Sequence, residues 1–77
     1  MIISVRVHAE LQCYTGDEGT FSLEVEPGTT AQQLLQRLGI PEGEVYAVVV
    51  DRQIASNSTA LTPGAHVDLI PPLGGGH

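Results

Sequence analysis

The chain has 77 residues, 42% hydrophobic and 16% charged, which supplies enough apolar material for a core and too little charge for a disordered segment. Its 9 acidic and 3 basic residues give a formal net charge of −6, and every basic residue is an arginine. Nucleic-acid binding needs clustered cations that displace counterions, so this charge balance argues against DNA and RNA as partners.

The N-terminal segment Met1–Glu10 alternates apolar and polar residues, with no run long enough for a signal peptide or a membrane helix. The single cysteine, Cys13, excludes an internal disulfide, a four-thiolate zinc site and a cysteine-ligated iron–sulfur cluster. His8 and His66 lack a third ligand, which favours surface histidines over a metal site. We therefore expect a cytoplasmic protein that binds neither membrane nor metal.

The first part of the chain predicts a β-hairpin. Apolar and polar residues alternate over residues 3–8 and again over residues 21–25, the pattern of strands with one buried face. Between them, Gly16, Asp17 and Gly19 indicate a turn. We expect two strands joined by a loose loop.

One helix of about three turns is predicted after this hairpin. Thr30 suits the N-cap position, and Gln33 can complete a capping box. Gly39 and the following proline stop the helix. The leucines at helical spacing over residues 34–38 form one apolar face, which must lie on a sheet.

The rest of the chain predicts three more strands. Residues 45–51 are rich in β-branched residues, and a turn at Asp51–Arg52 leads to a short return strand. A turn at Pro63–Gly64 precedes the last strand, which ends at Ile70. This order predicts an α+β, β-grasp (ubiquitin-like) fold: a mixed four- to five-stranded sheet, one main helix on one face, and the last strand parallel to the first.

The second face of this sheet has nothing to cover it. Ile2, Val48 or its neighbours, and Ile70 are expected on that face. Exposed apolar residues there indicate a docking patch, although scattered surface apolar residues are an alternative.

The segment "PPLGGGH" ends the chain. Pro71 and Pro72 force an extended segment that leaves the sheet. Three glycines without Cβ atoms, Gly74–Gly76, let the backbone enter a narrow channel; a merely flexible end is the alternative. We expect a single domain over residues 1–70 and an extended, flexible tail over residues 71–77.

Three passages, "PGTTAQQLLQRLGI", "AVVVDRQIA" and "LTPGAHVDLIPPLGGG", resemble the MoaD/ThiS family of ubiquitin-like sulfur carriers. This resemblance places the family's C-terminal diglycine on Gly75 and Gly76. It implies that a ubiquitin-activating-type partner adenylates Gly76, using ATP and magnesium held by that partner. The resulting thiocarboxylate then passes sulfur to a biosynthetic enzyme, as in molybdopterin or thiamin synthesis.

The same resemblance implies a carrier that is not an enzyme, and a docking role for the residues Ile70, Pro71, Pro72 and Leu73. His77 departs from the family pattern because it follows the diglycine. It is cleaved, is the remnant of a tag, or inactivates the carrier. A ubiquitin-like modifier attached to lysines, and an interaction module with an inert tail, are the alternative functions.

Overall fold

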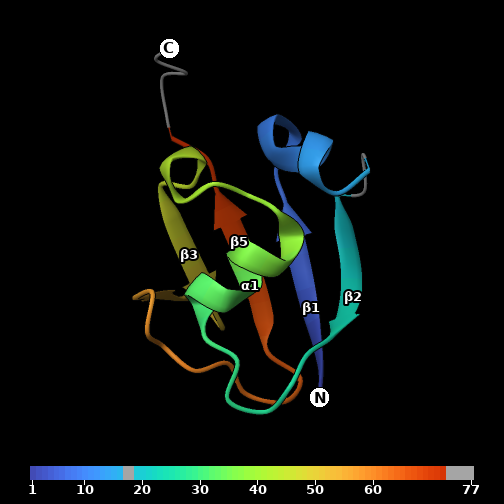
Figure 1. Ribbon diagram of the computed structural model, residues 1–77, viewed down its shortest axis with the longest axis vertical. Helices are drawn as coiled ribbons and strands as arrows, with labels where there is room; N and C mark the ends of the chain where they lie inside the picture. Colours follow the sequence, from blue (N-terminus) through green and yellow to red (C-terminus); the bar gives the residue numbers. More distant parts are fainter. Residues whose placement is uncertain (17–18, 73–77) are drawn as a thin grey trace.

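The computed structural model describes residues 1–16 and 19–72, which form a five-stranded mixed sheet with one α-helix on one face (Figure 1). The elements are β1 (Ile2–Val7), the 3₁₀ helix η1 (Ala9–Tyr14), β2 (Thr20–Glu24), α1 (Ala31–Leu38), the 3₁₀ helix η2 (Glu42–Glu44), β3 (Ala47–Val50), β4 (Gln53–Ala55) and β5 (His66–Ile70). This is the α+β, β-grasp arrangement that the sequence predicts. Within the described ranges, no helix combines the length and apolar character that a membrane span requires.

The last strand lies in the middle of the sheet, whose strand order is β2-β1-β5-β3-β4. Strand β5 is parallel to β1, with Val67 opposite Val5, and antiparallel to β3. Strands β1 and β2 form one antiparallel hairpin, and β3 and β4 form the other. The predicted parallel pairing of the last strand with the first is confirmed.

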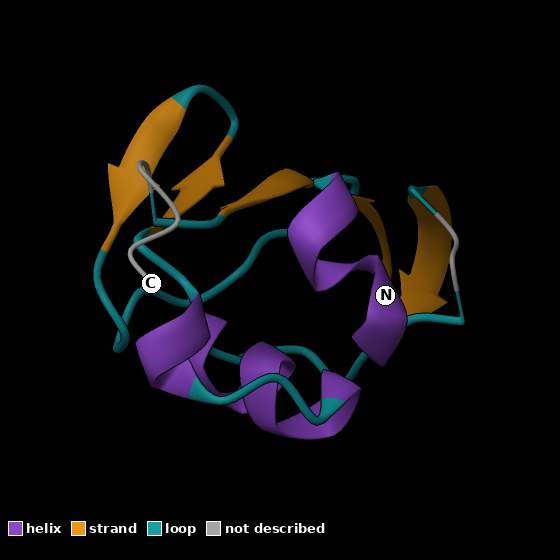
Figure 2. Ribbon diagram, turned by 90° about the horizontal axis from the view of Figure 1, so that it is seen from above, coloured by secondary structure: helices purple, strands orange, loops and turns teal. Residues whose placement is uncertain are grey.

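The core lies between the sheet and the helical layer (Figure 2). Alternate residues of β1 and β5 point into it, as the period of a strand requires. The buried hydrophobic residues are Ile3, Val5, Val7, Leu11, Val25, Ala31, Leu34, Leu35, Ile40, Val48, Leu61, Ala65, Val67 and Leu69.

The sequence places Val48 or one of its neighbours on the open face; that residue is Val49, and Val48 itself lies on the covered face of the sheet. The residue is only 6% exposed and pairs with Leu69, whose side chain also points into the core. Its neighbour Val49 pairs with Asp68 on the opposite face. In a dense valine run every side chain is apolar, so the sequence alone does not fix which residues face inward.

Helix α1 is held by the predicted caps. The Thr30 hydroxyl oxygen accepts a hydrogen bond from the Gln33 backbone N–H at 3.2 Å, and the Gln33 side-chain oxygen accepts one from the Thr30 N–H at 3.0 Å. Gly39 ends the helix in the left-handed region at φ 75°. With 8 residues the helix makes just over two turns rather than three, because residues 27 and 28 form a turn before the cap.

The β3–β4 hairpin reverses at Asp51 and Arg52, as predicted, and both residues have positive φ, at 50° and 73°. Such a tight turn normally favours glycine or asparagine, since a Cβ is strained there. The Asp51 carboxylate accepts a hydrogen bond from the His66 backbone N–H at 2.9 Å. The Asp51 N–H in turn donates to the His66 carbonyl at 2.9 Å. These bonds fix the turn against β5.

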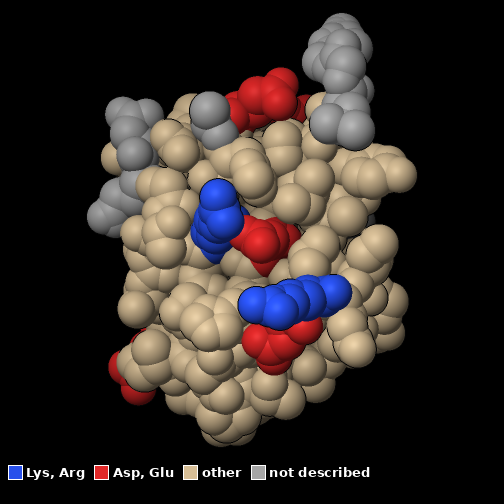
Figure 3. Space-filling view, turned by 180° about the vertical axis from the view of Figure 1, so that it is seen from behind, with Lys and Arg blue, Asp and Glu red and all other residues tan. Residues whose placement is uncertain are grey.

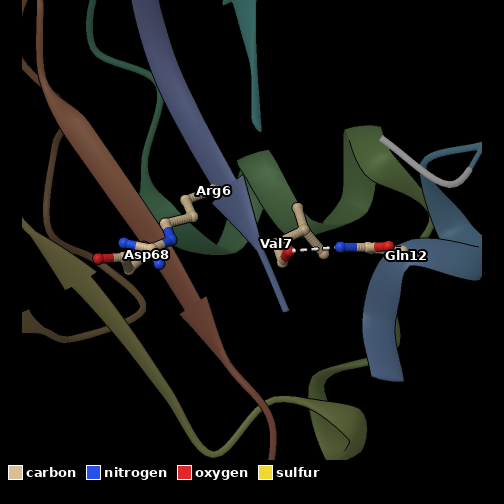
Figure 4. Close-up of polar contacts among 4 residues, drawn as sticks. All are labelled: Arg6, Val7, Gln12 and Asp68. Atoms are coloured by element: carbon tan, nitrogen blue, oxygen red, sulfur yellow. Dashed lines mark hydrogen bonds and ion pairs between the residues drawn. The ribbon is translucent and has the colours of Figure 1, made fainter. Parts of the chain in front are cut away.

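The connection between β1 and β2 is more ordered than the predicted loose loop, because it contains η1. Leu11 of η1 is 1% exposed and belongs to the core. The Gln12 side-chain amide donates to the Val7 carbonyl at 3.2 Å, which ties η1 to the end of β1 (Figure 4). A short 3₁₀ helix with one buried leucine carries no periodic sequence signal.

Replacing Leu35 tests the packing of α1 on the sheet. Leu35 is 2% exposed, so Leu35→Ala leaves a cavity and should lower the free energy of unfolding by about 2–5 kcal/mol. Gln36→Ala, on the exposed side of the same helix, should change it by less than about 0.5 kcal/mol. Denaturant unfolding of both variants measures the difference, and equal midpoints would contradict this packing.

Candidate functional site

The candidate site begins where β5 ends. Ile70 pairs with Ala47 of β3, and its carbonyl accepts a hydrogen bond from the Tyr46 N–H at 2.7 Å. Ile70 is half-buried. The point where the chain leaves the sheet is therefore fixed by the central strand, which has neighbours on both sides.

Pro71 and Pro72 explain why the strand stops at this point. Proline has no N–H, so neither residue can donate to a neighbouring strand, and each fixes φ near −65°. Pro71 is half-buried and Pro72 is exposed. The backbone thus passes from a paired strand to an unpaired segment within two residues.

The other predicted site residues lie outside the described part of the chain. These are Leu73, Gly74, Gly75, Gly76 and His77. Their roles as the docking segment, the adenylated glycines and a processing site stay predictions.

Both 3₁₀ helices, which the sequence analysis missed, border the end of the sheet where β5 ends (Figures 1 and 2). Partial desolvation, and then electrostatic interactions with Glu44 in η2 and with Cys13, raise the pKa of the Tyr14 phenol above its usual 10.0. Like any tyrosine, Tyr14 is neutral at physiological pH, and its O–H is available as a hydrogen-bond donor. Tyr46 is 73% exposed beside Ile70. Tyr46 is thus next to the exit of the chain, and Tyr14 and Glu44 lie on the two 3₁₀ helices at the same end of the sheet.

The uncovered face of the sheet adjoins this exit. Ile2 is 55% exposed on this face, in agreement with the prediction of apolar residues there. Arg6 of β1 and Asp68 of β5 pair directly across the sheet, so positive and negative side chains lie next to each other on the same face (Figure 3). The face combines apolar and charged side chains.

The described residues offer no recognisable metal centre, because no three His, Cys, Asp or Glu side chains among them lie close enough to hold an ion. Cys13 is an exposed free thiol. The candidate site therefore consists of the uncovered sheet face and of the point after Ile70 where the backbone leaves the sheet.

Comparisons with known proteins agree with this architecture. The sequence model of the ThiS family matches residues 5–76. None of the curated proteins is similar enough in sequence to match the chain.

Three solved structures illustrate the similarity in fold. A Pyrococcus furiosus protein described as subunit 1 of a molybdopterin converting factor has a TM-score of 0.77 at 20% identity, covering 95% of this chain and 99% of that one. Small archaeal modifier protein 1 of H. volcanii has a TM-score of 0.76 at 17% identity, covering 94% and 98%. A complex of subunits 1 and 2 of the molybdopterin-converting factor of Helicobacter pylori has a TM-score of 0.64 at 23% identity, covering 99% of this chain and 100% of that one. At these identities the likeness shows the ubiquitin-like β-grasp fold.

Titration of Tyr14 tests the arrangement of η1 and η2 beside the exit. Glu44→Gln removes one of the negative charges that oppose ionisation, so the pKa of Tyr14 should fall. It should stay above 10.0, because desolvation is the larger cause of the shift. Ring-carbon NMR shifts of Tyr14 followed against pH measure the change. Glu24→Gln, on β2, is the control and should leave the pKa of Tyr14 unchanged. An unchanged pKa of Tyr14 in Glu44→Gln would contradict the placement of η2 beside η1.

Proposed function

The chain belongs to the ThiS family, and on that premise we propose that it is a sulfur carrier whose C-terminal glycine is adenylated and then converted to a thiocarboxylate. The observation that carries this proposal is the extent of the family match, which runs through Gly76 and so includes the diglycine. The proposal places the carrier in the cytoplasm, where ATP is available to its partner.

The proposed chemistry takes place on a partner enzyme. A carboxylate is a poor electrophile, so one of its oxygens first attacks the α-phosphate of ATP and displaces pyrophosphate. A sulfide-level sulfur nucleophile then attacks the acyl-adenylate carbon, and AMP leaves with the carboxylate oxygen. The partner holds ATP and magnesium, which neutralise the charge of the phosphates. The carrier contributes the terminal carboxylate and itself catalyses nothing.

The structure of the exit supports this role. Ile70 is held by β3 on one side, while Pro71 and Pro72 end the pairing. A terminal carboxylate connected through glycines to such a fixed point can enter a narrow active site, because glycine has no side chain to exclude. We infer that Leu73 contacts the entrance of that site and that residues 71–77 act as the tail of a domain formed by residues 1–70.

Two classes of partner follow from the proposal. The first is a ubiquitin-activating-type adenylating enzyme. The second is a biosynthetic enzyme that accepts the sulfur, by analogy with the two-subunit complex of the Helicobacter pylori converting factor. Molybdopterin synthesis is the pathway that this analogy favours, and thiamin synthesis is its counterpart within the family.

A protein modifier is the second candidate function, because the fold is equally similar to small archaeal modifier protein 1. A modifier would use the same adenylated glycine and differ only in the acceptor, a lysine amine in place of a sulfur nucleophile. The chain contains no lysine, so in either role its activated end cannot form an isopeptide bond with one of its own side chains.

Mass spectrometry of the C-terminus tests the carrier function. A chain ending at Gly76, incubated with its adenylating enzyme, ATP and a sulfur donor, should gain the mass of one oxygen-to-sulfur exchange at the terminus. The same reaction without ATP is the control. Conjugates with other proteins in a cell extract would favour the modifier instead, and binding without any mass gain would favour an inert interaction module.

His77 supplies a second test. An additional residue moves the terminal carboxylate onto His77 and places an imidazole where only glycine fits, so the 77-residue chain should bind the enzyme but not react. Its affinity should differ by less than about tenfold, or ~1.4 kcal/mol, from that of the chain ending at Gly76. ATP–pyrophosphate exchange measures adenylation of both forms. Equal rates would show that His77 is tolerated and need not be removed.

A further inference from the structure

The connection between β4 and β5 begins with a turn that the proposed chemistry does not use. Residues 56–59 form this turn, in which the Thr59 backbone N–H donates to the Ser56 carbonyl at 3.1 Å. Its two central residues, Asn57 and Ser58, are exposed, and Asn57 is the one asparagine in the sequence. Asparagine is a thermolabile residue, and it loses its side-chain amide most readily where a small residue follows it in an exposed segment. The turn provides both conditions.

The two groups that would react are not held by the fold. Within the described residues, neither the Asn57 side-chain amide nor the Ser58 backbone N–H forms a hydrogen bond, although the hydroxyls of the turn contact one another. Ser58 has no β-branch, so its side chain leaves the backbone nitrogen accessible. The nitrogen of Ser58 and the side-chain carbonyl carbon of Asn57 are therefore neighbours in the chain, and no other group competes for either.

The backbone of the same turn holds the start of α1. The Gln32 N–H donates to the Asn57 carbonyl at 3.1 Å. The Ala31 N–H donates to the Thr59 carbonyl at 3.0 Å. These two N–H groups belong to the first turn of the helix, where no acceptor exists inside the helix itself. Leu61, two residues after the turn, is 3% exposed and lies in the core. A longer backbone in this turn would therefore disturb the start of the helix and a core residue.

We propose that Asn57 and Ser58 form a self-modification site of the folded chain. The Ser58 backbone nitrogen attacks Cγ of Asn57 and forms a C–N bond. The C–N bond of the side-chain amide breaks, and its nitrogen leaves as ammonia with the proton of the Ser58 N–H. Water then opens the cyclic succinimide. Addition of water at Cγ gives aspartate at position 57, and addition at the backbone carbonyl carbon gives isoaspartate. This inference does not depend on the proposed function.

The two products act on α1 in opposite directions. Aspartate keeps the backbone of the turn and adds a negative charge close to the N-terminus of the helix, where negative charge is stabilising. Isoaspartate carries the main chain through Cβ and Cγ, which lengthens the backbone by one carbon atom before Ser58. The carbonyl that accepts from the Gln32 N–H then no longer belongs to the main chain of the turn. Isoaspartate therefore loosens the start of α1, and chains that carry it are less stable than newly made ones.

Mass spectrometry of the full chain, incubated at mildly alkaline pH without denaturant, tests the reaction. The mass should rise by the replacement of one –NH₂ with –OH, and fragment ions should place the change at residue 57. Ser58→Val puts a β-branch beside the attacking nitrogen and should slow the reaction several-fold. Gln32 and Gln36 are exposed amides on α1 and serve as internal controls, because a glutamine must close a larger ring, which is slower. Equal rates for the wild type and Ser58→Val, or an amide loss spread over the glutamines, would overturn the proposal.

A destabilised variant shows whether the reaction takes place in the folded chain. Val5→Ala leaves a cavity in the core at β1 and raises the unfolded population, while the turn itself is unchanged. Because Asn57 and Ser58 are already exposed in the folded chain, the rate of amide loss should rise by less than about threefold. A rate that rises in proportion to the unfolded population would place the reaction in the unfolded chain and would contradict the proposal.

The products, separated by chromatography, test the effect on α1. The aspartate product should unfold at a denaturant midpoint equal to or above that of the unreacted chain, and Asn57→Asp should match it. The isoaspartate product should unfold at a lower midpoint, and its Gln32 amide should exchange hydrogen with solvent faster, because that N–H has lost its acceptor. An isoaspartate product with the midpoint and the Gln32 exchange rate of the unreacted chain would show that the turn does not hold the helix, and would overturn this part of the inference.

Discussion

The pairing of β5 with β1 and β3 holds the whole sheet together. Without β5 the chain has two separate hairpins, because β1 pairs otherwise only with β2, and β3 only with β4. Neither hairpin alone would give α1 a continuous surface to cover, and isolated hairpins are at best marginally stable. The strand that leads into the tail is therefore also the strand on which the core depends.

Much of this fold could be predicted because its signals are local. The alternation along β1 and the Thr30–Gln33 capping box are short-range patterns with a direct physical meaning. Two kinds of feature were not predictable in this way. Leu11 is buried by a 3₁₀ helix that has no periodic pattern, and the inward face of the valine run at β3 depends on its pairing with β5.

The candidate site was predictable in part. The exit at Ile70 and the role of the prolines follow from the chemistry of the residues themselves. The contact between Arg6 and Asp68 does not, because it joins positions far apart in the sequence and depends on the register of a parallel pair. The clustering of Tyr14 with Glu44 likewise depends on two helical segments that meet only in the folded chain.

The central position of β5 has a consequence for the way the protein is made. Synthesis begins at the N-terminus, so β5 is the last of the five strands to leave the ribosome. The sheet cannot close until residues through Ile70 have emerged. A nascent chain interrupted earlier exposes the apolar side chains of unjoined hairpins and becomes a substrate for chaperones and proteases. Folding thus acts as a check that translation has reached the end of the last strand.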